Sequence, residues 1–218
     1  MTLRLVCLLC LLGGYCFGMF ESGVVIGKII GKDPRKGGSG NIGATNMVRV
    51  AGLGPGLLTL ILDLVKVFLA VILANVIVRG VLDLSIDYRA LCLYTGLGAV
   101  LGHDFPVYLK FKGGKGVAGT VALIICLGDW KLIVIGALAF FIPFLITKYV
   151  SLGSLCLVSA CFIGFIIFMF TGLTYVAAGW EADCIIIFAV LVFLVFIQHR
   201  ENIARLAKGE EKKLSLKK

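Results

Sequence analysis

Long apolar runs separated by short polar stretches make up most of this 218-residue chain. A run of about 20 apolar residues can cross the hydrocarbon core of a bilayer as a helix, where the backbone must satisfy its own hydrogen bonds. Only 15 % of the residues are charged, compared with about 25 % in soluble domains. The pattern predicts an all-α integral membrane protein, with residues 1–218 forming a single domain.

The apolar runs differ in length. Five of them are expected to be spans, and they cover residues 1–30, 51–78, 90–101, 152–170 and 184–197, of which 90–101 is short. The first begins with Arg4 and could be a signal peptide, but no cleavage site is obvious, so we expect a retained span. Two further runs, 117–127 and 132–146, are short enough to be either two spans or one re-entrant hairpin. We expect about seven transmembrane helices, some short or re-entrant, with five crossings as the alternative.

The basic residues predict the orientation of the chain. Most of the 21 Lys and Arg residues lie on one side of this arrangement, including those from Arg200 onward, and the opposite side holds Arg4, Arg79, Arg89 and Lys131. By the positive-inside rule, the N-terminus is then outside and the C-terminus is cytoplasmic. The net charge of +9 could suggest nucleic acid, but no nucleic-acid-binding motif is present.

Two sets of residues within the apolar runs have a structural interpretation. The eight cysteines lie in or beside these runs without zinc-like spacing, so we expect small apolar side chains and no metal site. Asp63 and Lys66 lie three residues apart in one run, where they can pair on one helix face. A structural ion pair and a substrate contact are both open, because ionisable groups inside a span usually face the interior of the bundle.

Three polar stretches could carry chemistry, and the first is GSGNIGATN at 38–46, followed by Arg49. Its glycines allow a close backbone approach, its polar side chains can donate and accept hydrogen bonds, and Arg49 can hold a phosphate with two bonds. The candidate binding residues are Ser39, Asn41, Thr45, Asn46 and Arg49. The alternative is a capped loop, since Ser and Asn are common N-caps.

The second stretch, GHDFPVYLKFKGGKGVAGT, covers 102–120. Its centre consists of Lys112, Gly113, Gly114, Lys115 and Gly116. Consecutive glycine N–H groups can form a concave anion site, and phosphate suits it best. The stretch is not a Walker A loop, because Leu109 stands where that motif needs glycine. The alternative is a basic loop whose glycines provide only flexibility.

The third stretch, HRENIARL at 199–206, begins a basic tail. In a helix, His199 and Asn202 share one face and Arg205 lies three residues beyond Asn202. The alternative is that His199 is an interfacial or capping residue and that Glu201 pairs with Arg205 on the surface.

Taken together, in this order and spacing, the three stretches resemble the bacterial acyl-phosphate:glycerol-3-phosphate acyltransferases. The resemblance covers essentially the whole chain and includes Asp63-x-x-Lys66. One departure is at Met19, Phe20 and Glu21, where the family usually writes Ser-Ile-Pro after a glycine. A second is the extra Gly119. We expect both departures to affect the packing of the spans more than activity.

The resemblance implies an enzyme of the bacterial inner membrane, among membrane lipids, with its active site facing the cytoplasm. Such an enzyme moves a fatty acyl group from acyl phosphate to the 1-hydroxyl of glycerol 3-phosphate. The products are lysophosphatidic acid and inorganic phosphate, and the reaction opens phospholipid synthesis. No cofactor and no metal are implied.

The resemblance also assigns roles to residues of the three stretches. The candidate catalytic residues are Ser39, Arg49, His199 and Asn202. The candidate substrate- and phosphate-binding residues are Asn41, Thr45, Asn46, Lys112, Gly113, Gly114, Lys115, Gly116, Arg200 and Arg205. His199 and Asn202 would orient the glycerol hydroxyl, and its proton would pass to His199 or to the departing phosphate.

Other functional classes fit the sequence less well. A transporter of phosphorylated solutes is the main alternative, but it should show an internal repeat with discontinuous helices, and none is visible. A CDP-alcohol phosphotransferase needs a cluster of aspartates to bind metal, whereas Asp63, Asp83 and Asp87 are scattered. A chelator separates these classes, because only the phosphotransferase should lose activity.

Overall fold

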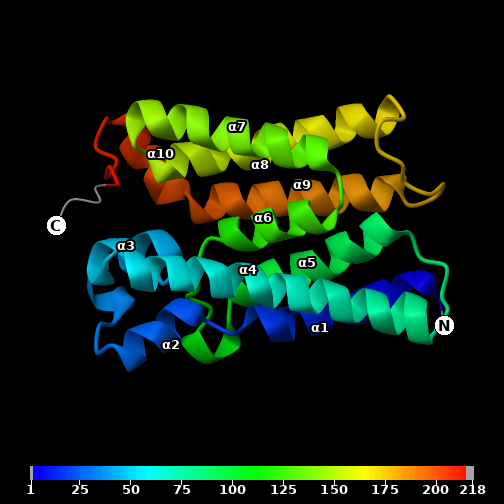
Figure 1. Ribbon diagram of the computed structural model, residues 1–218, viewed down its shortest axis with the longest axis horizontal. Coiled ribbons are helices and arrows are strands. Elements are labelled where there is room, and N and C mark those ends of the chain that lie inside the picture. The colour runs from blue at the N-terminus through cyan, green and yellow to red at the C-terminus, as the bar shows by residue number, and fades with distance from the viewer. Residues whose placement is uncertain (1, 215–218) are drawn as a thin grey trace.

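The computed structural model describes residues 2–214 as helices that mostly run along one long axis (Figure 1). No strand occurs within this range. The α-helices are α1 (Leu3–Gly18), α2 (Ser22–Ile29), α3 (Ala44–Ala51), α4 (Leu53–Asn75), α5 (Tyr88–Asp104), α6 (Val117–Cys126), α7 (Trp130–Thr147), α8 (Val150–Phe170), α9 (Glu181–Gln198) and α10 (Arg200–Ala207). The shorter turns are the 3-10 helices η1 (Pro34–Lys36) and η3 (Val107–Leu109) and the π-helix η2 (Val76–Val81).

The structure confirms an all-α fold of the membrane type. Five segments are long and apolar enough to cross a membrane: Leu3–Ile29, Leu53–Val81, Trp130–Thr147, Val150–Phe170 and Glu181–Gln198. The helices α5 (17 residues) and α6 (10 residues) are not among these five segments. Figure 1 shows that they stop short of the end that α4 and α7 reach. The loop that joins α5 to α6 therefore lies inside the outline of the bundle.

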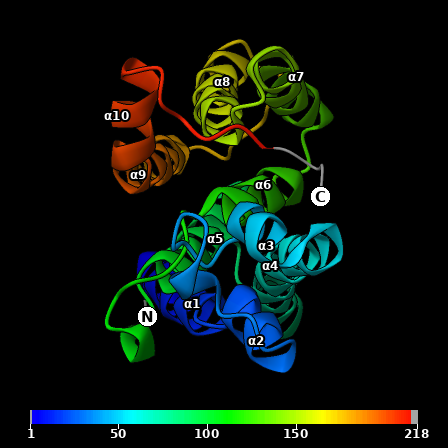
Figure 2. The same cartoon turned by 90° about the vertical axis from the view of Figure 1, so that its left-hand side faces the viewer.

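The helices form two groups with α6 between them (Figure 2). One group contains α1, α4 and α5, and the other contains α7, α8 and α9. Buried apolar residues from both groups and from α6 make up the main core, with Val67, Leu93, Leu123, Val158 and Phe188 among them. The N-terminus lies at the end of the bundle opposite to α3 and α10 (Figure 1).

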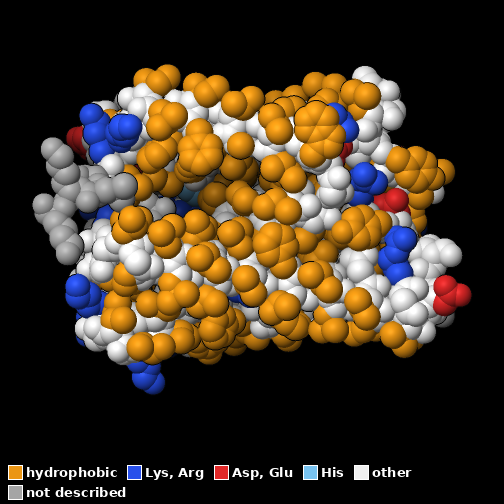
Figure 3. Space-filling view, viewed as in Figure 1, with side chains coloured by type: hydrophobic (Ala, Val, Ile, Leu, Met, Phe, Trp, Pro, Cys, Tyr) orange, Lys and Arg blue, Asp and Glu red, His pale blue; other side chains and the backbone are white. Residues whose placement is uncertain are grey.

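The distribution of side chains is inverted relative to a water-soluble protein. Large apolar residues face outward, as Leu12 (60 % exposed) and Ile146 (78 %) illustrate, whereas Asp63 and Lys66 are buried. Figure 3 shows the hydrophobic surface between two ends that carry the charged side chains. The predicted pairing is confirmed, because Lys66 Nζ lies 3.1 Å from Asp63 Oδ1. Such a surface suits contact with lipid, where ionisable groups turn to the interior.

The helices α1 and α5 approach each other closely through glycines. Each helix contributes a G-x-x-x-G pair: Gly14 and Gly18 in α1 lie against the backbone of Thr95 and Ala99, and Gly98 and Gly102 in α5 lie against that of Leu11 and Tyr15. A Cβ atom on Gly98 would lie only 1.9 Å from the carbonyl oxygen of Leu11. Small residues at this spacing let membrane helices pack backbone against backbone. This contact fixes where α5 ends and hence where the loop after it begins.

We expect the variant Gly98→Ala to be strongly destabilised, by roughly 1–3 kcal/mol or more, because its methyl group collides with backbone that cannot rotate away. Gly13→Ala is the matched control, since Gly13 lies in α1 with no atom within 4 Å of the added Cβ. Thermal unfolding in detergent, followed by circular dichroism, measures both. Equal unfolding temperatures for the two variants would contradict the glycine contact.

Candidate active site

A cavity of about 640 Å³ lies between the two helix groups, and Figure 3 shows a hollow between them toward the end that carries α3 and α10. One part of its wall is polar and includes Ser39, Asn41, Thr45, Asn46, Arg49, Lys115, Gly116, His199, Asn202 and Glu211. The other part is apolar and comes mainly from α4, α6, α7 and α8, with Leu60, Val121, Ile125, Ala137 and Phe141 among its residues. The three polar stretches of the sequence therefore converge on one cavity.

The side chain of Asn46 organises the first stretch. Its Oδ1 accepts a hydrogen bond from the Ser39 N–H at 2.7 Å, and its Nδ2 donates to the carbonyl oxygens of Pro34, Gly37 and Asn41. Asn46 is only 2 % exposed. Its amide thus holds the loop closed, and direct binding of substrate by Asn46 stays a prediction.

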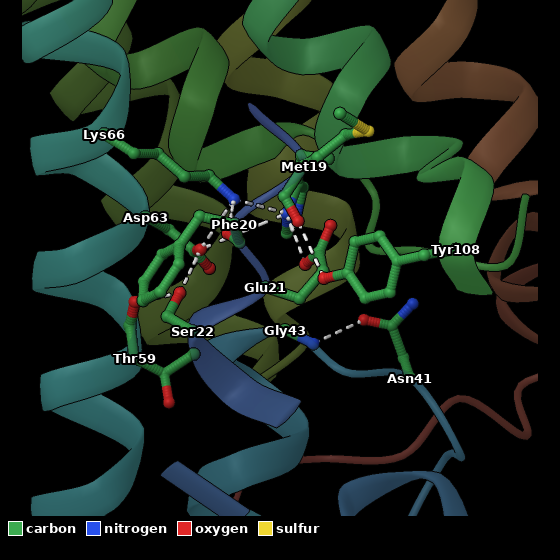
Figure 4. Close-up of polar contacts among 11 residues, drawn as sticks. Met19, Phe20, Glu21, Ser22, Asn41, Gly43, Thr59, Asp63, Lys66 and Tyr108 are labelled. Atoms are coloured by element: carbon green, nitrogen blue, oxygen red, sulfur yellow. Dashed lines mark hydrogen bonds and ion pairs between the residues drawn. The ribbon is translucent and has the colours of Figure 1, made fainter. Parts of the chain in front are cut away.

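The other residues of this stretch are better placed to meet a ligand. Asn41 Oδ1 accepts a hydrogen bond from the Gly43 N–H at 2.9 Å (Figure 4), and the Nδ2 group of Asn41 takes no part in this contact. Ser39 is exposed at the cavity, and Thr45 lies in the first turn of α3. Arg49, in the last turn of α3, donates from Nη2 to the Lys212 carbonyl oxygen at 3.0 Å. These groups form the wall of the cavity on the side of α3.

The glycines of the second stretch act differently from the expectation. The Gly113 N–H donates to the carbonyl oxygen of Asp104 at 3.0 Å, and the Gly114 N–H donates to that of His103 at 2.9 Å. Both amides are therefore engaged with backbone and are not directed at an anion. Gly116 has a φ of +68°, which favours glycine, and lies directly before α6. Among these residues, Lys115 and Gly116 line the cavity.

Lys115 joins the second stretch to the third. Its Nζ donates to Asn202 Oδ1, in the first turns of α10. Burial, together with the charge of Arg205, lowers the pKa of Lys115 to about 8. The ammonium group is thus charged at neutral pH but close to its titration point.

His199 lies at the junction of α9 and α10 and is 4 % exposed. Its Nδ1 lies 2.8 Å from the Val195 carbonyl oxygen. A carbonyl oxygen only accepts, so Nδ1 carries the proton and Nε2 of the neutral ring is left as an acceptor. Burial and the nearby charge of Lys115 lower the pKa of His199 to about 4, so the ring is neutral at physiological pH.

Glu211 is a site residue that the sequence interpretation missed. The residue is buried, with 7 % of its surface exposed. Oε1 accepts hydrogen bonds from Asn202 Nδ2 at 2.6 Å and from Ser151 Oγ at 2.9 Å. Oε2 accepts a hydrogen bond from Arg205 Nε at 2.8 Å. Burial opposes its charged form, but these hydrogen bonds lower the pKa of the carboxyl below its usual value. The carboxylate thereby orients Asn202 and holds Arg205 beside the cavity.

Three of the cationic residues predicted for the site do not line the cavity: Lys112, Arg200 and Arg205. Lys112 and Arg200 are exposed and do not line it. Arg200 instead donates to the Ile197 carbonyl oxygen at 3.3 Å. Arg205 reaches the site only through Glu211, and its Nη1 lies 4.0 Å from Glu201. Arg49 and Lys115 are the cationic side chains in the cavity wall.

Asp63, His103 and Ser151 also line the cavity. Asp63 belongs to the intramembrane pair for which the sequence allows a substrate contact, His103 lies within the second stretch, and Ser151 stands at the start of α8, outside all three stretches. Within residues 2–214, no three His, Cys, Asp or Glu side chains gather closely enough to hold a metal ion. Activity without metal stays a prediction, for the chelator experiment to test.

Comparisons with known proteins agree with this geometry. A family model described as glycerol-3-phosphate acyltransferase matches residues 8–209. The glycerol-3-phosphate acyltransferase of Staphylococcus aureus (strain Newman) is 40 % identical over 208 residues, which cover 94 % of this chain and 96 % of the relative. That of Thermotoga petrophila is 39 % identical over 204 residues, covering 93 % and 94 %.

Two solved structures have the same fold. The crystal structure of PlsY (YgiH), an integral membrane glycerol 3-phosphate acyltransferase, in its glycerol 3-phosphate form is 33 % identical, with a TM-score of 0.79 over 96 % of both chains. The lysophosphatidic acid form is 32 % identical, with a TM-score of 0.77 over 96 % of both chains. The match over nearly the whole chain confirms the resemblance, and the protein belongs to the glycerol-3-phosphate acyltransferase family.

Proposed function

We propose that this protein transfers a fatty acyl group from acyl phosphate to the 1-hydroxyl of glycerol 3-phosphate. The observation that carries this function is the continuity of the cavity, whose polar part holds Arg49, Lys115 and His199 and whose apolar part runs between α4, α6, α7 and α8. A phosphorylated head group fits the first part and an acyl chain fits the second. One cavity can thus bring both halves of the reaction together. The resemblance to the acyl-phosphate-dependent enzymes supports the choice of donor.

The cationic groups of the cavity can offset the negative charge of these two substrates. Glycerol 3-phosphate and acyl phosphate both carry negative charge, so they repel each other unless positive groups lie between or beside them. Arg49, in α3, and Lys115, just before α6, both line the cavity. Arg205 contacts Glu211, which also accepts a hydrogen bond from Asn202. We assign phosphate binding to Arg49 and Lys115, and Arg205 adds to the positive field.

The reaction needs orientation more than a strong nucleophile. The glycerol 1-hydroxyl oxygen attacks the carbonyl carbon of acyl phosphate, the bond from that carbon to the phosphate oxygen breaks, and inorganic phosphate leaves. A mixed anhydride is already activated, so placing the hydroxyl near the carbonyl and stabilising the developing charge accounts for most of the catalysis. Ser39 and Thr45 can donate to the phosphate or carbonyl oxygen from the wall at α3.

His199 fits the role of orienting the hydroxyl. Its Nε2 is the free acceptor of a ring fixed through Nδ1 by the Val195 carbonyl oxygen. A base whose pKa is about 4 takes a proton less readily than a phosphate group, whose second pKa is about 6. We therefore assign the proton to the departing phosphate, with His199 and Asn202 holding the hydroxyl in place.

The location that we propose is the bacterial inner membrane, with the site at its cytoplasmic face. The end of the bundle that carries α3 and α10 also carries most of the basic loops, among them Lys32, Arg35, Lys36 and Lys148. The positive-inside rule puts such an end in the cytoplasm, and the N-terminus then lies outside. A cysteine-accessibility test with Ser39→Cys and a membrane-impermeant thiol reagent on intact cells would check this orientation.

The proposed reaction is tested with the purified protein in lipid, using labelled glycerol 3-phosphate. Palmitoyl phosphate, palmitoyl-CoA and palmitoyl-acyl carrier protein are offered in parallel, with and without a chelator. We expect lysophosphatidic acid from palmitoyl phosphate alone and no effect of the chelator. Product from the thioesters alone would contradict the donor. No product from any donor would favour the transporter alternative, which uptake of labelled glycerol 3-phosphate into proteoliposomes would then examine.

The pKa of Lys115 predicts a pH dependence. The ammonium group is charged below a pKa of about 8 and loses its charge above it, whereas the substrate phosphate, with a second pKa of about 6, is already mostly ionised at about pH 7. The KM for glycerol 3-phosphate should therefore rise by up to about tenfold between about pH 7 and pH 9. Lys115→Arg keeps its charge over this range and should flatten the profile; a rise of equal size in this variant would contradict the assignment.

The apolar part of the cavity predicts selectivity for the acyl chain. Ala137 in α7 lines the cavity, and a phenyl group at this position would fill the space expected for the distal carbons. Ala137→Phe should lower turnover of palmitoyl phosphate by about tenfold or more but spare octanoyl phosphate. Leu138→Phe is the matched control, because Leu138 is 55 % exposed on the outer face. Equal losses with both chain lengths would show that the acyl chain lies elsewhere.

A further inference from the structure

The first membrane segment is interrupted between α1 and α2, and this interruption is tied to the loop that precedes α6. The Met19 carbonyl oxygen accepts a hydrogen bond from the Tyr108 hydroxyl at 2.7 Å, and the Phe20 carbonyl oxygen accepts from Lys66 Nζ at 2.8 Å. Figure 4 shows both contacts around Glu21, which lies at the centre of the interruption. The interruption thus contacts η3 and α4 at the same time.

Glu21 places a carboxylate in the interior of the bundle. It is 1 % exposed, and its Oε2 lies 2.9 Å from Nδ1 of His103, which is 5 % exposed. Lys66 Nζ lies 2.9 Å from the same Nδ1 and 3.1 Å from Asp63 Oδ1. A carboxylate buried in this way is costly unless a donor is paired with it. Two groups of opposite charge, the Glu21 carboxylate and the Lys66 ammonium, therefore contact the same nitrogen of the His103 ring.

One ring nitrogen cannot donate to Glu21 and accept from Lys66 at once. Lys66 has other acceptors, namely Asp63 Oδ1 and the Phe20 carbonyl oxygen. Within residues 2–214, neither carboxylate oxygen of Glu21 has a hydrogen-bond partner, and His103 Nδ1 is the group that lies against Oε2 as an ion pair. A proton on Nδ1 would serve this buried carboxylate while Lys66 keeps its other acceptors, so we place the proton on Nδ1. Without the carboxylate, Nδ1 would become the acceptor of Lys66.

The ring of His103 lies directly against the loop that carries Lys115. A Cβ atom on Gly114 would come within 1.9 Å of His103 Nε2, so only glycine fits there. The Gly114 N–H also donates to the His103 carbonyl oxygen at 2.9 Å. A change in the orientation of this ring would displace Gly114 and, with it, the next residue, which lines the cavity.

We propose that Glu21 is a positioning residue that, by holding His103 Nδ1–H, fixes the ring beneath Gly114 and so the placement of Lys115 for phosphate binding. This role rests on the function proposed above. A purely structural role for Glu21 predicts something different. Replacing a buried charge by an apolar side chain of similar size is often neutral or stabilising, so stability and substrate affinity would both be retained.

The kinetic test compares Glu21→Met, which removes the acceptor, with Glu21→Gln, which keeps an oxygen that Nδ1–H can contact. We expect the KM for glycerol 3-phosphate to rise about fivefold or more in Glu21→Met, with kcat changed less, and to recover largely in Glu21→Gln. Asp183→Leu is the matched control, because Asp183 pairs with Arg4 at 3.1 Å between α1 and α9. It should alter stability without changing KM. An unchanged KM in Glu21→Met would overturn the proposal.

A second measurement needs neither substrate nor turnover and so separates this proposal from the proposed function. The chain contains two histidines, and ¹⁵N-histidine NMR of the protein and of His199→Gln assigns the signals of His103. We expect a protonated Nδ1 in the unaltered protein and a changed ring signal in Glu21→Met. An unprotonated Nδ1 in the unaltered protein would overturn the proposal even if acyl transfer were confirmed. If no donor supports transfer, calorimetric binding of glycerol 3-phosphate replaces KM in the comparison.

Discussion

The backbone contact between α1 and α5 is the constraint on which the rest of the site depends. Glycines at four positions let the two helices touch without side chains between them, and a Cβ on Gly102 would lie 2.1 Å from the Tyr15 carbonyl oxygen. The Tyr15 hydroxyl in turn donates to the Phe105 carbonyl oxygen at 2.7 Å, just beyond the end of α5. Because α5 cannot slide or rotate on α1, the loop that carries Lys115 begins at a fixed height inside the bundle.

Polar side chains in the interior are linked in two networks that meet at this loop. On one side, Lys115 contacts Asn202, which donates to Glu211. On the other side, His103 lies between the loop and Glu21. In a dry interior an unpaired polar group is costly, so each member restricts its neighbour. The side chains that we propose to bind substrate are thus oriented in advance, which is what charge stabilisation in a transition state requires.

Periodicity and motif order predicted the helical fold, the Asp63–Lys66 pair and the convergence of three stretches. They could not predict contacts between residues that are far apart in the sequence and close together in the fold. Glu211 lies in the C-terminal tail, for which the sequence predicted only a basic character. It is a site residue because its carboxylate accepts hydrogen bonds from Ser151 and Arg205. The sequence predicted that the Gly114 N–H could bind phosphate, but it donates to the carbonyl oxygen of His103 at the end of α5. The α1–α5 contact did have a signal, the paired G-x-x-x-G spacings.

The division of the cavity also bears on the choice of donor. With the amides of Gly113 and Gly114 engaged, the phosphate recognition that we propose falls to two side chains of the cavity wall, Arg49 and Lys115. Two cations suit two phosphates better than one. A thioester donor would bring a single phosphate to the reacting centre, that of glycerol 3-phosphate, and would leave one of these two half-buried cations without an anion beside it. In the reaction that we propose, the acyl phosphate supplies the second anion at the carbon that reacts, and its departure as inorganic phosphate removes that anion together with the proton of the hydroxyl.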